Sequence, residues 1–132
     1  MNKKYTHILW ISRHPPLRIQ RKVLKELFGD ISFTLWETGV RDAEHAIELK
    51  KMFDADEIVT ILPLTIVQKL CELGIYPLYP EMKLIHDNCK VEGCVEFNPD
   101  TDYIDFNAKK HWRFSRFVRV KDVKMICEEI IK

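Results

Sequence analysis

Ser12, Arg13 and His14 are the residues whose types and position most strongly suggest chemistry, because they follow a short apolar run and precede two prolines. An arginine where a helix begins favours binding of an anion such as phosphate. A histidine can gain or lose a proton near neutral pH. The alternative is structural: Arg13 pairs with Glu37 or another surface carboxylate, and His14 faces solvent.

More residues join this group if the chain forms a parallel sheet, because the carboxyl ends of parallel strands meet at one edge where ligands bind. We therefore predict an anion-binding site from six residues: Ser12, Arg13, His14, Thr38, Arg41 and Thr65. Catalysis there would need a second titrating group besides His14. Glu37 is the only obvious one, so His14 and Glu37 are the catalytic candidates.

A basic stripe is the second candidate surface. Its residues follow the i, i+3, i+4, i+7 spacing that places side chains on one face of a helix: Arg18, Arg21, Lys22 and Lys25. Such a stripe can bind the phosphate backbone of a nucleic acid or an acidic partner. The alternative is an ordinary solvated helix face.

Residues 109–121 form the densest basic and aromatic segment. Aromatic rings stack on exposed bases and arginines follow phosphates, so this composition suits single-stranded nucleic acid. The candidate nucleic-acid contacts here are Lys110, Trp112, Arg113 and Arg116. Two alternatives stay open: a homodimer interface, where Trp, Phe and Arg are enriched, or simple packing of the aromatic residues inside the fold.

Metal and cofactor chemistry is not indicated. His86, Cys89 and Cys94 have part of a zinc-site spacing but lack a second ligand pair, so a free-thiol hairpin or a disulfide are the alternatives there. Cys71 and Cys127 have apolar neighbours and are expected to be buried free thiols. Motifs for a P-loop, a serine nucleophile elbow, a zinc protease and a calcium-binding EF-hand are absent, so we predict no metal and no cofactor.

The elements that would position these residues alternate along the first part of the chain. Apolar runs predict strands at residues 7–12, 31–37, 57–62 and 75–80, and helical periodicity predicts helices at residues 17–28, 42–53 and 65–74. Gly29 suits a left-handed cap at the end of the first helix, and Asp42 can cap the start of the second. The last helix would open with a capping box at Thr65 and Gln68. Prolines at 77 and 80 would place the fourth strand at a sheet edge or make it irregular. Strand–helix alternation in residues 7–80 predicts a Rossmann-like three-layer α/β domain with a mainly parallel sheet.

The remainder of the chain reads as a β-rich C-terminal extension. Short strand candidates lie at residues 83–87, 90–97, 102–107 and 116–123, separated by turn-forming residues. The last ten residues have the apolar spacing of a short helix. We find no linker or repeat, and expect one domain over residues 1–132.

The composition is that of a folded globular chain: 132 residues, 46% hydrophobic, 31% charged, with a net charge of +1. No apolar run is long enough to span a bilayer or form a signal peptide, so a cytoplasmic protein without membrane contact is expected. These features predict a binding protein for an anionic ligand, a nucleotide or a nucleic acid, without metal or redox chemistry. Two alternatives remain: a metal-independent phosphodiester-cleaving enzyme using Arg13 and His14, and a homodimeric protein-interaction module.

Overall fold

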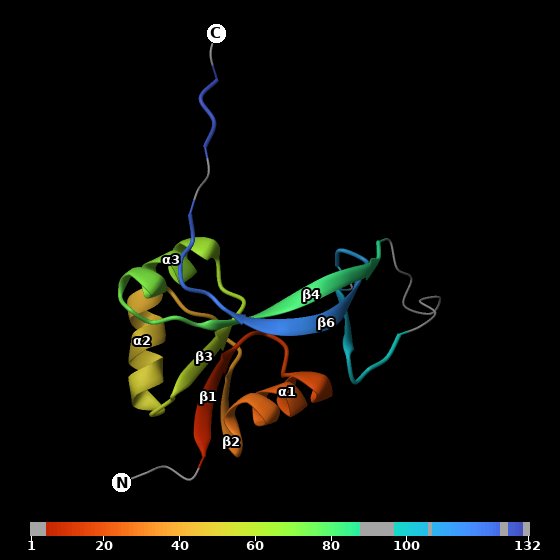
Figure 1. The fold of residues 1–132 in the computed structure, drawn as a ribbon, viewed down its shortest axis with the longest axis horizontal. Coiled ribbons are helices and arrows are strands. Elements are labelled where there is room, and N and C mark those ends of the chain that lie inside the picture. The colour runs from red at the N-terminus through yellow and green to blue at the C-terminus, as the bar shows by residue number, and fades with distance from the viewer. Residues whose placement is uncertain (1–4, 88–96, 106, 125–126, 131–132) are drawn as a thin grey trace.

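The structure is a computed structural model that describes residues 5–87, 97–105, 107–124 and 127–130. These residues form a curled sheet of six strands with three helices (Figure 1). The elements follow one another as β1 (Thr6–Ile11), α1 (Arg18–Phe28), β2 (Ile31–Trp36), α2 (Ala43–Met52), β3 (Glu57–Thr60), α3 (Leu64–Glu72), β4 (Leu78–His86), β5 (Asp102–Asp105) and β6 (Lys110–Arg119).

The sheet is mixed, which contradicts the prediction of a mainly parallel Rossmann-like three-layer domain. Its strand order is β2-β1-β3-β4-β6-β5. The pairs among β2, β1, β3 and β4 are parallel, but β4–β6 and β6–β5 are antiparallel. Parallel pairs need crossover connections, usually helical. The described residues hold no helix after α3, so the longest strands pair antiparallel, and the helices cover only part of the sheet (Figure 1).

Strand β1 is the centre of the hydrophobic core, as its continuous apolar run predicted. Leu9 and Ile11 point to one face of the sheet and pack with α2 and α3. Ile8 and Trp10 point to the other face and pack with Leu24 of α1. Side chains alternate between the two faces of a strand, so β1 stabilises both halves of the core at once.

Helix ends were predicted correctly in two places and wrongly in a third. Gly29 follows α1 with a φ of 78°, in the left-handed region that favours glycine. Asp42 caps α2 by accepting a hydrogen bond from the backbone N–H of His45. The capping box at Thr65 is wrong: α3 begins one residue earlier, after Pro63, without a side-chain cap.

The fourth strand is not at a sheet edge, so that alternative is wrong, whereas the other alternative, an irregular strand, agrees with the register shifts in its pairing with β6. Residues predicted as two separate strands form the single nine-residue strand β4, between β3 and β6. Its only registered pair with β3 is Val59 with Leu78. Pro80 lies beyond that pair, so its missing N–H leaves no gap in the β3 ladder.

Strands β4 and β6 are irregular where aromatic residues gather. The register shifts between Glu81 and Met82, which pair with Arg116 and Phe114 and leave Ser115 as an extra residue. A bulge of this kind re-aims the side chains that follow it. Phe114 and Phe117 therefore contact each other, with ring centroids 4.9 Å apart, although an odd spacing would normally place them on opposite faces.

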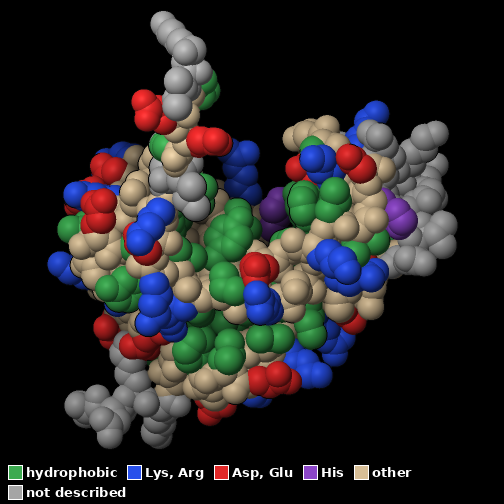
Figure 2. Space-filling view, turned by 45° about the horizontal axis from the view of Figure 1, so that its top comes forward, with side chains coloured by type: hydrophobic (Ala, Val, Ile, Leu, Met, Phe, Trp, Pro, Cys, Tyr) green, Lys and Arg blue, Asp and Glu red, His purple; other side chains and the backbone are tan. Residues whose placement is uncertain are grey.

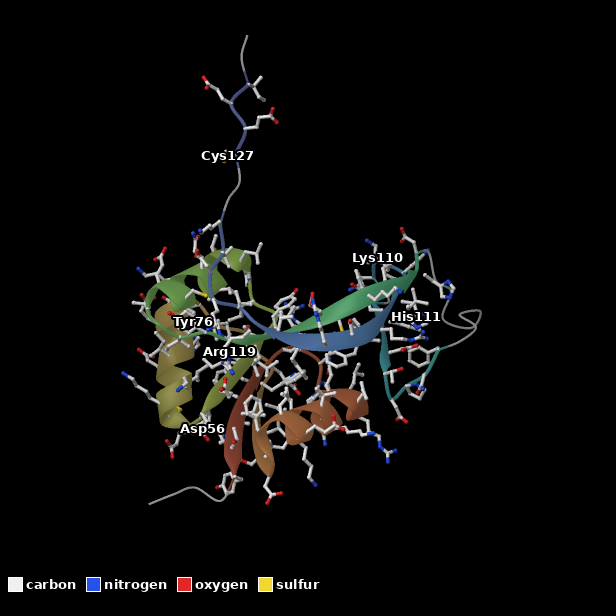
Figure 3. All side chains as sticks on the ribbon, in the orientation of Figure 1. Asp56, Tyr76, Lys110, His111, Arg119 and Cys127 are labelled. Carbon is white, nitrogen blue, oxygen red and sulfur yellow. The ribbon has the colours of Figure 1, made fainter. Side chains whose placement is uncertain are left out.

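The end of the chain differs from its predicted short helix. Residues 121–124 and 127–130 have no regular secondary structure, and Ile130 is exposed. Cys127 is exposed as well, on a segment that extends away from the sheet (Figure 3), so its predicted burial is wrong. A helix this short is marginal in water unless an apolar face packs on a neighbour. Cys71, by contrast, is a buried free cysteine as predicted.

Candidate functional site

The carboxyl ends of β1, β2 and β3 surround a hollow of about 470 Å³, here called the strand-end hollow. The sequence prediction placed several of its residues at such a site. It is lined by Ile11, Ser12, Arg13, His14, Glu37, Thr38, Gly39, Val40, Ile61, Leu62, Pro63 and Tyr103. The topology brings them together because the three strands are parallel and end at the same edge.

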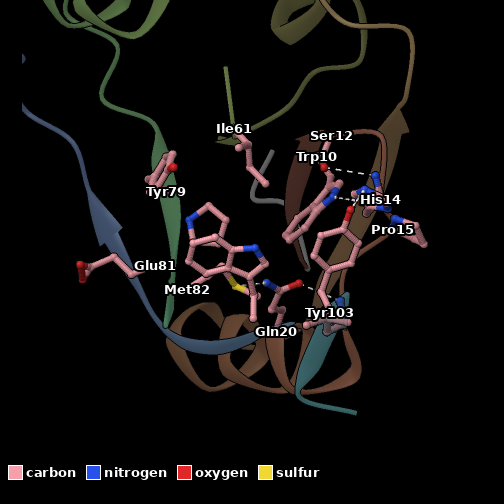
Figure 4. A pocket seen from close by; sticks show the side chains of 13 residues that line it. Trp10, Ser12, His14, Pro15, Gln20, Ile61, Tyr79, Glu81, Met82 and Tyr103 are labelled. Atoms are coloured by element: carbon pink, nitrogen blue, oxygen red, sulfur yellow. Dashed lines mark hydrogen bonds between the residues drawn. The ribbon is translucent and has the colours of Figure 1, made fainter. Parts of the chain in front are cut away.

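A second hollow of about 390 Å³ lies beside it and is here called the aromatic hollow. Its walls come from β1, the start of α1, and strands β4, β5 and β6 (Figure 4). It is lined by Trp10, Ser12, His14, Pro15, Leu17, Gln20, Ile61, Tyr79, Pro80, Glu81, Met82, Tyr103 and Trp112. Four of these are Trp or Tyr, and volumes of this order are typical of small-molecule sites.

The two hollows adjoin each other, because Ser12, His14, Ile61 and Tyr103 line both, and together they are here called the cleft. In the space-filling view, hydrophobic side chains gather along a hollowed face of the molecule (Figure 2). An apolar cavity bordered by a few polar groups is the usual form of a ligand site.

His14 and Tyr103 stand at the junction of the two hollows. Tyr103 Oη lies 2.7 Å from His14 Nε2, and the ring centroids are 4.3 Å apart. Burial, and then the negative charge of Asp105, raise the pKa of Tyr103, so the phenol keeps its proton at neutral pH. A ligand that spans both hollows would pass this pair.

Trp10 fixes the position of His14. The indole Nε1–H donates to the backbone carbonyl of His14 over 2.7 Å. The same indole packs edge-on against Phe33 and Phe117, with ring centroids 6.4 and 6.3 Å away. Because Trp10 is only 2% exposed, the segment after β1 is tied to the core beneath it.

Strand β5 carries Tyr103 into the cleft and is held there by two sets of contacts. The backbone N–H of Ile19 in α1 donates to the carbonyl of Asp100, just before β5, over 3.0 Å. On the other face of β5, the Asp102 carboxylate lies 2.7 Å from His111 Nε2 and accepts from Arg113 Nε over 2.9 Å. The side chains of Asp102 and His111 are fully buried.

The Asp102 carboxylate is held in its charged form. Burial by itself would raise its pKa, but hydrogen bonds from Arg113, Thr101, the backbone of Asn98 and His111 outweigh burial and hold the pKa far below its usual range. Tyr103 is the next residue and pairs across the strands with Trp112. The buried cluster thus positions two aromatic walls of the cleft.

Several predicted site residues lie in the cleft, and others do not. Ser12, Arg13, His14, Glu37 and Thr38 line the strand-end hollow. Arg41 and Thr65 are exposed and are not among the residues lining either hollow.

The two catalytic candidates, His14 and Glu37, line the same hollow without a hydrogen bond between them in the described structure. His14 instead uses Nε2 to contact Tyr103. Arg13 and Glu37 form no ion pair among the described residues, so the structural alternative for Arg13 is not seen. Phosphodiester cleavage by Arg13 and His14 stays a prediction.

The predicted nucleic-acid contacts divide into two groups. The helix stripe is solvent-exposed on α1: Arg18, Arg21, Lys22 and Lys25. In β6, Arg113 is bound to Asp102, and Arg116 Nε donates to Glu81 over 2.6 Å. Lys110 begins β6, and Trp112 lines the aromatic hollow. With Phe114 buried and Phe117 packed on the core, the aromatic residues of this segment favour the packing alternative.

The predicted metal-like spacing falls mostly outside the described residues. Cys89 and Cys94 belong to residues 88–96, which the structure does not describe, so the choice among their alternatives stays open. Within the described ranges no group of three or more His, Cys, Asp or Glu side chains could hold a metal ion. The described part of the chain also holds no helix with the length and apolar character of a membrane span.

Sequence reasoning missed four residues that line the cleft, Trp10, Gln20, Met82 and Tyr103. It also missed the buried Asp102 next to Tyr103. The alternation in "DYID" could have placed Tyr103 and Asp102 on opposite faces of a short strand. Nothing local indicates that β5 lies beside the start of α1, about eighty positions earlier in the chain.

No protein-family model, no curated protein and no solved structure matches the chain.

Proposed function

We propose that this protein binds a small anionic ligand with a flat ring, specifically a nucleoside monophosphate. The ring would lie in the aromatic hollow and the phosphate in the strand-end hollow, next to Arg13. The observation that carries the proposal is that the two hollows adjoin each other, one walled by tryptophan and tyrosine and the other containing an arginine at the strand ends.

The aromatic walls suit a nucleobase. Tyr103 and Trp112 are directly opposite each other on β5 and β6, and Tyr79 comes from β4 (Figure 4). Stacking of a base on an aromatic side chain stabilises binding by about 1–3 kcal/mol in nucleic-acid complexes. A sugar would then lie near His14 and Tyr103, at the junction of the hollows.

The charges support one phosphate rather than three. Among the residues that line the cleft in the described part of the chain, Arg13 is the only arginine or lysine. Glu81 is already bound to Arg116, and Glu37 remains as a nearby negative charge. A triphosphate would bring more charge than one arginine balances.

Arg13 and Arg41 offer a matched pair for the test, since both are exposed arginines near the strand ends but only Arg13 lines the cleft. We expect Arg13→Ala to weaken binding of inosine monophosphate about tenfold, the effect of losing a charged phosphate contact. Binding of inosine, which has no phosphate, should not change. Titration calorimetry with both ligands measures this directly.

Arg41→Ala is the control and should bind both ligands as the wild type does. An Arg13→Ala protein that binds inosine monophosphate with unchanged affinity would refute the position of the phosphate. A wild-type protein that binds neither the nucleotide nor the nucleoside at millimolar concentration would refute the proposed function.

The nucleic-acid alternative has less support. Two of its arginines, Arg113 and Arg116, already bind carboxylates of the same chain, which leaves mainly the α1 stripe. A homodimer through residues 109–121 is also not part of the proposal, because these residues include β6, which has a strand on each side. A cytoplasmic location remains the expectation for a chain with a buried free thiol at Cys71.

A further inference from the structure

Gln20 is a buried amide on the first turn of α1 that lines the aromatic hollow and is only 4% exposed. Its carbonyl oxygen, Oε1, accepts a hydrogen bond from the backbone N–H of Leu17 over 2.7 Å. Its amino group, Nε2, has a single contact among the described residues, the Met82 sulfur 3.9 Å away. In Figure 4 the amide lies between Met82 and Tyr103.

The orientation of this amide is fixed by the backbone. Rotating it by half a turn would place Nε2 against the Leu17 N–H, two donors facing each other. The oxygen must therefore face Leu17, and the amino group must face Met82 and the hollow. A side-chain amide has two N–H donors, and a thioether is a weak acceptor. At least one donor of a nearly buried group thus lacks a good acceptor within the described protein.

The thioether is the weak partner of Nε2, so a ligand oxygen at this place would offer the amide a stronger acceptor. Two other donors that line the hollow are already used within the chain. Trp10 Nε1 is used by the carbonyl of His14, and Tyr103 Oη is used by the His14 ring. The Gln20 amino group can therefore donate a hydrogen bond to an acceptor on the edge of a ring placed in the aromatic hollow.

We propose that Gln20 selects rings that present a carbonyl oxygen, so that the site prefers 6-oxopurine over 6-aminopurine nucleotides. This inference rests on the proposed function, since it assumes that the ring occupies the aromatic hollow. A carbonyl oxygen accepts from Nε2, whereas an exocyclic amino group would place a donor against a donor. Discrimination by a hydrogen-bonding site is strong because the wrong ring leaves the buried group unpaired.

Inosine and adenosine monophosphates form the natural test pair, because they differ at the 6-position and share the sugar and the phosphate. We expect the wild-type protein to bind inosine monophosphate about 5- to 10-fold more tightly, the effect of one hydrogen bond in place of a donor–donor contact. Purine riboside monophosphate, with only hydrogen at that position, should fall between them.

Gln20→Glu removes the amide N–H donors and keeps an oxygen that can accept from the Leu17 N–H. One carboxylate oxygen can still accept from Leu17, while the other now presents an acceptor to the ring. We expect the preference to reverse in favour of adenosine monophosphate. The added negative charge repels both phosphates equally, so the ratio of the two dissociation constants reports on the ring alone. Gln68→Glu is the matched control, since it makes the same substitution at an exposed glutamine of α3 that lines neither hollow, and it should keep the wild-type preference.

Calorimetric titration of the wild type, Gln20→Glu and Gln68→Glu with both nucleotides separates the outcomes. Equal affinity of the wild type for the two nucleotides overturns the role of Gln20 and leaves the proposed function standing. Failure of both to bind overturns the proposed function itself. If Gln20→Glu does not fold, the order of the wild-type affinities for the three purine nucleotides still decides whether the site prefers a carbonyl oxygen at the 6-position.

Discussion

Replacing Asp102 by asparagine should lower the free energy of unfolding by about 3–5 kcal/mol, the usual cost of breaking a buried ion pair by removing one partner. The carboxylate has zero exposed surface and receives hydrogen bonds from His111, Arg113 and Thr101. Asparagine keeps the shape but not the charge, so the fully buried His111 and the partly exposed Arg113 lose the charge of Asp102. Urea unfolding at neutral pH measures the difference.

The same substitution should change how stability depends on pH. The folded pKa of Asp102 is depressed, so its contribution is fully present above the unfolded value of about 4 and is lost as pH falls toward the folded value. The stability difference between wild type and Asp102→Asn should therefore be constant near neutral pH and shrink in acid. A difference that grows in acid would contradict the charged state of Asp102.

Glu81→Gln provides the control for this prediction. Glu81 also accepts a short hydrogen bond from an arginine, Arg116, but both side chains are largely exposed. Exposed ion pairs contribute between 0 and about 1 kcal/mol, so unfolding should change little. If Glu81→Gln lowered the free energy of unfolding as much as Asp102→Asn does, burial would not explain the contribution of Asp102 to stability.

Trp10→Ala is the second substitution with a large expected effect, about 3–5 kcal/mol of lost stability. The side chain is buried between Phe33 and Phe117 and beneath the segment that carries His14. Its removal leaves a cavity and frees the carbonyl of His14 from its donor. We expect a lower midpoint of thermal unfolding together with weaker nucleotide binding.

Trp10→Phe separates packing from positioning. Phenylalanine keeps most of the apolar volume but cannot donate to the His14 carbonyl. Stability should fall less than in Trp10→Ala, while binding of inosine monophosphate should still weaken because His14 loses its anchor. Unchanged binding in Trp10→Phe would show that the indole hydrogen bond does not organise the cleft.

The first half of the fold was largely predictable because its signals are local. The apolar run of β1, the periodicity of α1 and the cap at Asp42 each depend on neighbouring residues, and the structure contains all three. The strand-end hollow follows from them, since parallel strands with helical connections end at one edge. Ser12, Arg13 and Glu37 could therefore be placed together before the structure was known.

The second half was mispredicted because its organisation depends on contacts distant in sequence. Pro77 and Pro80 suggested an edge strand, yet β4 continues past them to pair with β6. Arg119 of β6 donates to Glu57 of β3 and to the carbonyl of Tyr76, which ties the two halves of the sheet together (Figure 3). Neither contact has a signature in the local pattern.

The aromatic hollow was missed for the same physical reason. It exists only because β5 lies beside α1, through the bond from Ile19 to Asp100, and because a bulge re-aims the aromatic residues of β6. The sequence indicated that residues 109–121 are rich in aromatic side chains, but their direction depends on register. Register is set by pairing across the sheet and not by composition.

The most direct test of the central claim uses the tryptophans of the cleft as reporters. The chain has three tryptophans, and Trp36→Phe would leave only Trp10 and Trp112, both of which line the aromatic hollow. Titrating this variant with inosine monophosphate should give saturable quenching at one ligand per chain, and ribose 5-phosphate, which has no ring, should give none. Equal responses to the two compounds, or no response to the nucleotide at millimolar concentration, would contradict a ring bound in the aromatic hollow.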